Sequence, residues 1–357
     1  MYFNPLQGFY HPECPTRLQI RRKRFLLMSD KAKIRRRLRC PQCGSLDSIK
    51  WGIRDGVQRY KCSCGCLFSA RRKEITASNR FVWFKKWVSG RMTIDEIADR
   101  SGYCTRQLHR WFDDYLDSSP TWTMNTSCPI YLLIDGTYYS DDHCLILYRA
   151  ENLKRTIFYR FTDHEDQNEI AIDLISIRDL GYDVIGITTD GGDNIIRAVD
   201  YVFPDIPRQR CVVHVQRECL NSITQRPRST EAKMFRNLVQ DLSICRTVND
   251  KLWWLNMYHR WEEDYKEFVF QKSVVTYSHQ EYYVHNDLRK AYIHLKRAIP
   301  NLFTYIDNPG TPKTTNALEA FFGHIKDQIR SHRGLSESRI DNFIKWFLFF
   351  NDEKKKK

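Results

Sequence analysis

The sequence predicts a mixed α/β fold, and two apolar runs in its middle third carry most of that prediction. Residues 131–135 read YLLID, residues 184–190 read VIGITTD, and glycine follows each aspartate. Uninterrupted apolar runs indicate strands covered on both faces, as in the parallel part of a sheet that lies between helices. The other expected elements are strands at 144–148, 156–161 and 210–215 and helices at about 167–180 and at 193–201.

In chain order these elements are three strands, a helix, a strand, a helix and a strand, which is the order of the RNase H-like fold. Asp135 and Asp190 would then end adjacent buried strands and approach one another. A divalent cation most simply relieves the repulsion between two such carboxylates. The alternative is that each Asp-Gly pair is only a turn signal, with its carboxylate in local hydrogen bonds.

A third acid, Glu319, lies in an expected amphipathic helix within residues 314–336, at the edge of its apolar stripe. Asn316 three residues earlier fits a capping box, which is one interpretation of this glutamate. The other is a metal ligand, since three acids at one point can hold two Mg²⁺ or Mn²⁺ ions ~4 Å apart and activate a water or a 3′-hydroxyl. The two aspartates favour the ligand, which could also help to cap the helix.

The charge of the chain indicates a polyanionic partner. Lys and Arg number 57 against 43 Asp and Glu, a net charge of +14. Residues 17–39 contain eleven basic residues and one acid, within an N-terminal arm at 1–39, and the chain ends in four lysines. Such an excess favours nucleic acid, here double-stranded DNA. With no signal-peptide pattern and no membrane-length apolar run, the expected location is the bacterial cytoplasm at the nucleoid, without a membrane partner.

Five of the twelve cysteines cluster between Cys40 and Cys66, which indicates one metal site in a reducing compartment. Residues 40–72 are too few to fold on an apolar core, so we expect a zinc ribbon with a structural Zn²⁺. The alternative is a set of small buried thiols. The expected ligands are Cys40, Cys43, Cys62 and Cys64, with Cys66 as the substitute for either of the last two.

Residues 75–118 predict a helix–turn–helix domain, because two short apolar faces flank a break at Gly102. The second helix would present polar and basic residues of the types that contact DNA grooves and phosphates. The alternative is an ordinary helical hairpin with a solvated basic face. The candidate DNA-contacting residues are Thr105, Arg106, Gln107, His109 and Arg110.

Several of these motifs together resemble the DDE transposases of bacterial insertion sequences, and the Mutator-like group most closely. The resemblance covers about 125–350, and the two N-terminal modules extend it to about 40. It implies a catalytic domain at 128–220 and 306–352, interrupted by a helical insertion at 221–305. The motifs are Asp135-Gly-Thr, Thr189-Asp190-Gly-Gly, Cys211-Val-Val-His214, Thr315-Asn-Ala-Leu-Glu319 and His332-Arg333-Gly-Leu-Ser336.

By this resemblance, Asp135, Asp190 and Glu319 bind two Mg²⁺ or Mn²⁺ ions. His214 would hydrogen-bond the scissile phosphate or shuttle a proton, unless it is only a satisfied buried histidine. We interpret Cys211, three residues before it, as packing. Basic residues near Glu319 would hold the DNA backbone, unless they form a solvated helix face. They are Lys326, Arg330 and Arg333.

An aromatic residue of the insertion would stack on a displaced base, as in related transposases. The candidates are Trp253, Trp254, Tyr258 and Trp261, and we name Trp254 as their representative. Because these residues recur at helical spacing, the alternative is that they are core residues. The expected activity is recognition of terminal inverted repeats, metal-dependent strand cleavage and transfer of the 3′-hydroxyl into target DNA, by a homodimer or larger assembly. The rival functions are a DNA-binding regulator on an inactive transposase fold and a nuclease without strand transfer.

Overall fold

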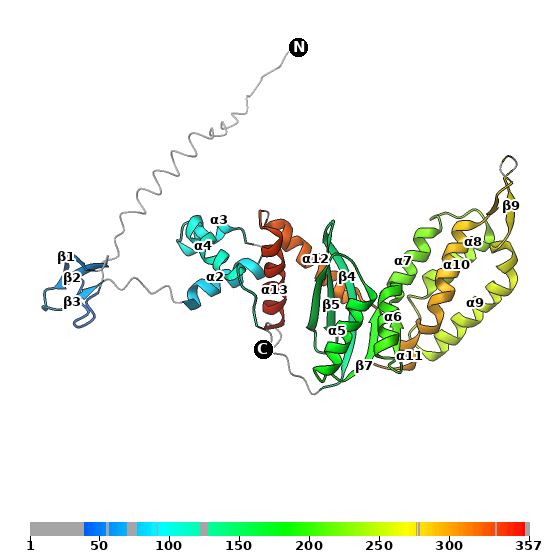
Figure 1. The fold of residues 1–357 in the computed structure, drawn as a ribbon, viewed down its shortest axis with the longest axis horizontal. Coiled ribbons are helices and arrows are strands. Elements are labelled where there is room, and N and C mark those ends of the chain that lie inside the picture. Colours follow the sequence, from blue (N-terminus) through cyan, green and yellow to red (C-terminus); the bar gives the residue numbers. More distant parts are fainter. Residues whose placement is uncertain are drawn as a thin grey trace, which may run out of the picture. The chain divides into compact units, whose positions relative to one another are not determined.

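The computed structural model describes residues 39–54, 57–69, 77–90, 92–121, 128–275, 277, 279–332 and 334–353 (Figure 1). The chain divides into two compact units between Arg80 and Phe81. The basic arm at 1–39, apart from Arg39, and the four terminal lysines lie outside the described residues.

The first unit contains a three-stranded antiparallel sheet in the order β1-β2-β3. Two tight turns beside it need glycine, because Gly44 and Gly65 have φ angles of 71° and 88°. In these turns the amide of Gly44 donates to Cys40 O and that of Gly65 to Cys62 O, each over 2.9 Å. The strands are β1 (Ser48–Arg54), β2 (Val57–Cys62) and β3 (Leu67–Ser69).

The second unit is built on a five-stranded mixed sheet in the order β6-β5-β4-β7-β8. Strands β4, β5 and β6 pair antiparallel, whereas β7 and β8 continue the sheet parallel to β4. This arrangement confirms the predicted mixed α/β class. The strands are β4 (Ile130–Ser140), β5 (His143–Ala150), β6 (Arg155–Thr162), β7 (Val184–Thr189) and β8 (Arg208–Arg210).

Helices cover both faces of this sheet. Helices α5 (Gln167–Asp179) and α6 (Asp193–Val202) share a core with Ile130, Leu132 and Ile134 of β4. On the chain's return to the sheet, α12 (Asn316–Ser331) contacts β4 and α13 (Glu337–Glu353) contacts β6. Successive side chains of a strand point to opposite faces, so Asp135 points away from the face that carries Ile134.

One predicted strand is wrong. Only Arg208–Arg210 form β8, and the chain turns at Cys211 into helix α7 (Val212–Ser222). The apolar residues of this segment are buried at Val212, Val215 and Cys219, a helical rather than an alternating spacing. This correction places His214 in the first turn of a helix.

Helices α2 (Ala77–Ser89), α3 (Ile94–Ser101) and α4 (Thr105–Leu116) precede the sheet. Thr93 and Glu96 form a capping box at the start of α3, and Gly102 ends it with a φ of 76°. Aromatic rings then join these helices to α13. Phe84 lies 5.4 Å from Trp346, and the indole of Trp346 donates to Tyr115 O over 3.0 Å.

His332 fastens the end of α12 to α2, and its burial predicts a pH-dependent stability. Its ring stacks on Trp87 at 4.5 Å, its Nε2 lies 3.1 Å from Trp87 O, and burial lowers its pKa. The unfolded chain therefore binds a proton that the folded state resists, and stability should fall as pH drops below about 6.5. The free energy of unfolding, measured in urea from pH 5 to 7.5, should change less with pH for His332→Phe than for wild type. An equal pH dependence in both proteins would contradict this role.

The chain between β8 and α12 forms a helical body with its own core, seen in green-yellow to orange in Figure 1. This core includes Val212 and Val215 of α7, and a short antiparallel hairpin of β9 and β10 projects from it. Its further elements are α8 (Thr230–Asp241), α9 (Val248–Val269), β9 (Lys272–Val274), β10 (Glu281–Tyr283), α10 (Asn286–Ala298), η1 (Ile299–Asn301) and α11 (Thr304–Asp307).

Candidate active site and metal centre

Sheet register brings the two aspartates together. Ile134 of β4 pairs with Thr189 of β7, so Asp135 and Asp190 are the next residues on neighbouring parallel strands. The prediction that Asp135 ends its strand is wrong. Asp135 lies in the middle of β4, at the point where the parallel pairing of β4 with β7 ends. It is 5% exposed. Burial, and then the negative charge of Asp190, raise the pKa of Asp135 to about 8.

Each aspartate also makes a local hydrogen bond. Oδ1 of Asp135 accepts from the amide of Gly136, and Oδ1 of Asp190 from the amide of Gly192, each over 3.0 Å. These bonds are the ones that a turn signal predicts, and they fix the direction of both carboxylates. A turn does not account for the burial of Asp135 beside a second acid, which costs free energy unless a cation compensates it.

Arg210 is a site residue that the sequence did not indicate. Its guanidinium lies against Gly191, where a Cβ would come within 1.8 Å of Cζ, and Nη1 donates to Gly191 O. Gly191 also has a φ of 91°, so glycine is required here for two reasons. Burial lowers the pKa of Arg210, while Asp190 and Asp193 favour its charged form. Arg210 therefore provides positive charge beside Asp190.

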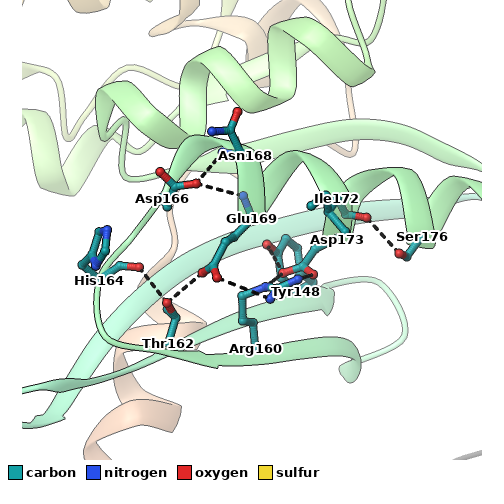
Figure 2. Close-up of polar contacts among 10 residues, drawn as sticks. All are labelled: Tyr148, Arg160, Thr162, His164, Asp166, Asn168, Glu169, Ile172, Asp173 and Ser176. Carbon is teal, nitrogen blue, oxygen red and sulfur yellow. Dashed lines mark hydrogen bonds and ion pairs between the residues drawn. The ribbon is translucent and has the colours of Figure 1, made fainter.

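Glu165 is a second unpredicted residue of this region. It lies in the turn between β6 and α5, whose neighbouring polar contacts are drawn in Figure 2, and its Oε1 would be 2.0 Å from a Cβ on Gly136. Burial and then the charge of Asp190 raise the pKa of Glu165. The glycine after Asp135 thus leaves space for another carboxylate. The only signal in the sequence was a run of acids at 163–169, from which no single residue could be chosen.

Glu319 does not cap its helix. The N-cap of α12 is Thr315, and it makes no side-chain capping bond, so the capping-box interpretation with Asn316 is wrong. The carboxylate instead accepts two hydrogen bonds from Arg217 of α7, over 2.8 and 3.1 Å. His214 Nε2 lies 3.3 Å from Oε1 of Glu319. Arg217 is the main cause that lowers the pKa of Glu319, and the sequence analysis missed it.

His214 connects the two groups of acids. Its Nδ1 lies 3.3 Å from Thr315 Oγ1, and its Nε2 faces Glu319. A hydrogen bond with Cys211, and then the charges of Cys211, Asp135 and Asp190, raise the pKa of His214 to about 9. The raised pKa favours the protonated imidazole, whose Nε2 faces the carboxylate of Glu319.

Cys211 does more than pack. It is fully buried, and its Sγ accepts a hydrogen bond from the amide of Thr315 over 3.3 Å. Burial by itself raises the pKa of this thiol, but the hydrogen bonds from His214 and Thr315 outweigh it and the pKa is lowered. The start of α7 and the start of α12 are thus tied together beside Glu319.

The three predicted acids do not converge on one point. Within the described ranges, only one group of three or more His, Cys, Asp or Glu has potential metal-ligand atoms that all lie within 4.8 Å of one another, namely Cys40, Cys43, Cys62 and Cys64. Asp135 and Asp190 share one side of the site with Glu165, while Glu319 is held by Arg217 and His214.

The cysteine group has the predicted composition and fits a Zn²⁺ ion, which structural sites hold tetrahedrally by four Cys or His ligands. The Sγ atoms of Cys40 and Cys64 lie 3.6 Å apart, and those of Cys43 and Cys62 lie 3.5 Å apart. Cys66, the predicted substitute, is outside the group. This arrangement is compatible with a zinc ribbon.

The candidate DNA-contacting residues differ in exposure. On α4, Arg106, His109 and Arg110 are exposed and Thr105 and Gln107 half-buried, while Leu108, Trp111 and Phe112 form the buried face. On α12, Lys326 is half-buried, and Arg330 is exposed with its Nη1 3.3 Å from Asp327. Arg333 lies outside the described residues.

Trp254 is a core residue, which corrects its assignment to DNA. It is fully buried, and its indole donates to Leu238 O over 2.8 Å. Tyr258 and Trp261 are buried beside it, whereas Trp253 is 48% exposed. The spacing i, i+4, i+7 from Trp254 is the helical signal of a buried stripe and distinguishes it from its neighbour.

This contrast gives a paired prediction. Trp254→Ala should destabilise the protein by about 3–5 kcal/mol, because it leaves a cavity and an unpaired carbonyl. Trp253→Ala should change stability by less than about 1 kcal/mol. Equilibrium unfolding in urea measures both changes, and similar losses for the two variants would contradict the assignment.

Comparison with known proteins gives one family match. Residues 150–271 match the model of the Mutator family of transposases, a segment that runs from the end of β5 past α9 and includes Asp190, His214 and Arg217. The match identifies a transposase domain, which is typical of enzymes that process DNA. More specifically, it confirms the resemblance to the Mutator-like group. A search of curated proteins found no match.

In the described part of the chain, no helix has the length and apolar character needed to cross a membrane.

Proposed function

We propose that this chain is a DNA transposase that binds the terminal inverted repeats of its element, cuts the strands there and joins the freed 3′-hydroxyl to target DNA. The observation that carries the proposal is the pair Asp135 and Asp190, held side by side by sheet register, with Asp190 inside the matched transposase segment. The order of strands and helices supports assignment of the second unit to the RNase H-like fold.

The donor set fits Mg²⁺ or Mn²⁺, since both prefer carboxylate oxygens. Burial and the charge of Asp190 disfavour the ionised form of Asp135, and a dication bound beside it would favour that form. Asp135 and Asp190 would hold the ions, with Glu319 as the third ligand once it separates from Arg217. When bound, two such ions polarise the phosphodiester and activate the attacking hydroxyl.

The chain's own cations have roles in this site. Hydrogen bonding with Cys211 and the nearby acids raise the pKa of His214, which favours a ring that donates from both nitrogens. We assign it a hydrogen bond to an oxygen of the scissile phosphate or the transfer of a proton there. Arg217 is half-exposed beside Glu319, so it would exchange that carboxylate for a DNA phosphate.

The N-terminal modules would provide recognition. The basic arm, the zinc ribbon and helices α3 and α4 would read the terminal repeats, with Arg106, His109 and Arg110 toward the DNA. Lys326 and Arg330 would contact the backbone near the acids. Of the four aromatic residues predicted as candidates in the insertion, Trp253 is the exposed one available to stack on a base. Two ends must be held together, so we propose a dimer or larger assembly, acting at the nucleoid.

A joining assay tests the proposal. A plasmid that carries the chain's gene with its flanking DNA supplies both ends, and Mn²⁺ or Mg²⁺ starts the reaction. Labelled end oligonucleotides should join to a second plasmid only if they carry a 3′-hydroxyl, and 3′-deoxy ends should not join. Cleavage without joining would favour the nuclease, and DNA binding without either reaction would favour the regulator.

A further inference from the structure

We infer that a basic hollow on helix α8, in the helical body of Figure 1, is a docking surface for the sugar–phosphate backbone of duplex DNA. The inference rests on the proposed function, since it adds a contact with the same partner, but the hollow lies outside the candidate active site. It has a volume of about 560 Å³, and within the described chain no acid lines it. Its charged and amide side chains are Arg226, Lys233, Arg236, Gln225, Asn237 and Gln240.

The sequence of α8 places most of these residues on one face of the helix. Ser229 caps the helix by accepting from the amide of Ala232, while Phe235 and Val239 are buried in the core of the helical body. The lining residues of α8 follow the first one by three, four and seven positions, which is the spacing of a single helix face. They are Lys233, Arg236, Asn237 and Gln240.

The turn before α8 completes the hollow. Nη1 of Arg236 donates to the carbonyl oxygens of Ile223 and Thr224, over 3.5 and 3.4 Å. This contact connects the turn to the helix, and Arg226 from the turn lines the same hollow as Lys233 from the helix. Two separate segments of the chain therefore contribute positive charge to one place.

The protein does not neutralise these cations. Among the described residues, no ion pair involves Arg226, Lys233 or Arg236. Lys251 of the same body, by comparison, lies 2.6 Å from a carboxylate oxygen of Asp307. Cations gathered in a hollow without a counter-charge raise the local potential and attract a polyanion.

The neighbouring flank of α8 has a different character. A second hollow there, of about 350 Å³, contains two acids, Asp241 and Asp264, and one cation, Arg260, beside the ring of Trp253. Asn237 lines both hollows. Because the two carboxylates would repel phosphates, the charges restrict a DNA backbone to the basic flank.

The length of the basic face favours a polymer over a single anion. The seven positions from Lys233 to Gln240 cover ~10 Å of helix, which corresponds to about three nucleotides of one DNA strand. Lysine and arginine contacts to phosphates position a protein on DNA but do not read its sequence. The expected contact is therefore independent of sequence.

The basic hollow is also fixed relative to the candidate active site. Nε2 of Gln216, on α7, donates to the carbonyl oxygens of Val239 and Gln240 over 2.8 and 3.1 Å. The next residue, Arg217, binds Glu319. DNA held on α8 would thus be held by a helix that is hydrogen-bonded to α7, the helix that contributes Arg217 to the site.

The salt dependence of DNA binding tests this surface. The full chain with Zn²⁺ in the ribbon, and without Mn²⁺, would be titrated onto a terminal-repeat duplex and a duplex of unrelated sequence by fluorescence anisotropy. The variant Arg226→Gln/Lys233→Gln removes two exposed charges. Its plot of log affinity against log salt should be shallower by about 2, because each phosphate contact contributes roughly 0.9 to the slope. The change should be the same on both duplexes.

The matched control is Lys266→Gln/Lys290→Gln, which removes two exposed charges from α9 and α10 outside the hollow and should keep the wild-type slope. Equal loss of slope in both double variants would show general charge attraction and overturn the docking surface. An unchanged slope in Arg226→Gln/Lys233→Gln, with DNA binding by wild type intact, would overturn it and leave the proposed function standing. Wild-type protein that binds neither duplex would contradict both. Thermal unfolding at the wild-type temperature is expected for each variant.

Discussion

Replacing Asp190 by asparagine should abolish both cleavage and joining, with a fall in rate on the order of 10³-fold or more. The change keeps the size of the side chain and the hydrogen bond from Gly192, but it removes the charge that would hold the cation next to Asp135. The measurement is the rate of plasmid nicking and of oligonucleotide joining in Mn²⁺.

The matched control is Asp183→Asn. Asp183 is exposed next to the other end of β7, so its variant shares the strand but not the site, and its rates should stay near wild type. Comparable DNA binding by both variants would show that the loss is chemical. Residual joining by Asp190→Asn near the control rate would contradict our assignment of the active site.

Removal of zinc should have the second large effect, a loss of folded structure that is limited to the first unit. Structural Zn²⁺ contributes about 10–16 kcal/mol of apparent free energy in zinc-finger peptides, and the small three-stranded sheet has little apolar core to replace it. Much of its apolar surface is exposed, including Ile49, Trp51 and Ile53 at 63%, 48% and 71%. A chelator, or Cys62→Ser, should therefore unfold the first unit.

Zinc content by mass spectrometry and limited proteolysis measure this prediction together. One Zn²⁺ per chain should be lost as cleavage sites between Arg39 and Ser69 become accessible, while the second unit stays resistant. Cys66→Ser is the matched control and should retain the metal, because Cys66 lies outside the group of four. Loss of zinc in Cys66→Ser, and not in Cys62→Ser, would show that the ligand set is wrong.

The strands of the five-stranded sheet and the helices that cover it were predictable, because a strand buried on both faces leaves a strong sequence signal. The runs before Asp135 and Asp190 could hardly form anything but covered strands, and helical spacing located α5 and α6. The prediction of a strand at Arg210–Val215 was wrong, because a short run of Cys and Val is equally typical of a strand and of a buried helix. The next buried residue, Cys219, was the sign of a helix.

The candidate site was predictable in part. Asp135, Asp190, Glu319 and His214 could be named from motifs, because the chemistry restricts which residue types serve. Residues that act through tertiary contacts could not. Arg217 looks like any surface arginine until α7 and α12 pack together, and Glu165 is one of several acids in a turn. Only the three-dimensional structure shows that Gly136 has no side chain because Glu165 lies there.

The measurement that tests the central claim most directly uses Glu319→Gln. This change keeps the shape of the side chain but provides a poor ligand for a hard dication. Wild-type protein and the variant would be incubated with the gene-bearing plasmid and labelled ends, with and without Mn²⁺, and with Zn²⁺ kept in the ribbon. We predict that the variant in Mn²⁺ folds and binds DNA but neither cuts nor joins, as wild type behaves without Mn²⁺. Cutting and joining at the wild-type rate would show that Glu319 is only a structural partner of Arg217 and that the catalytic centre lies elsewhere.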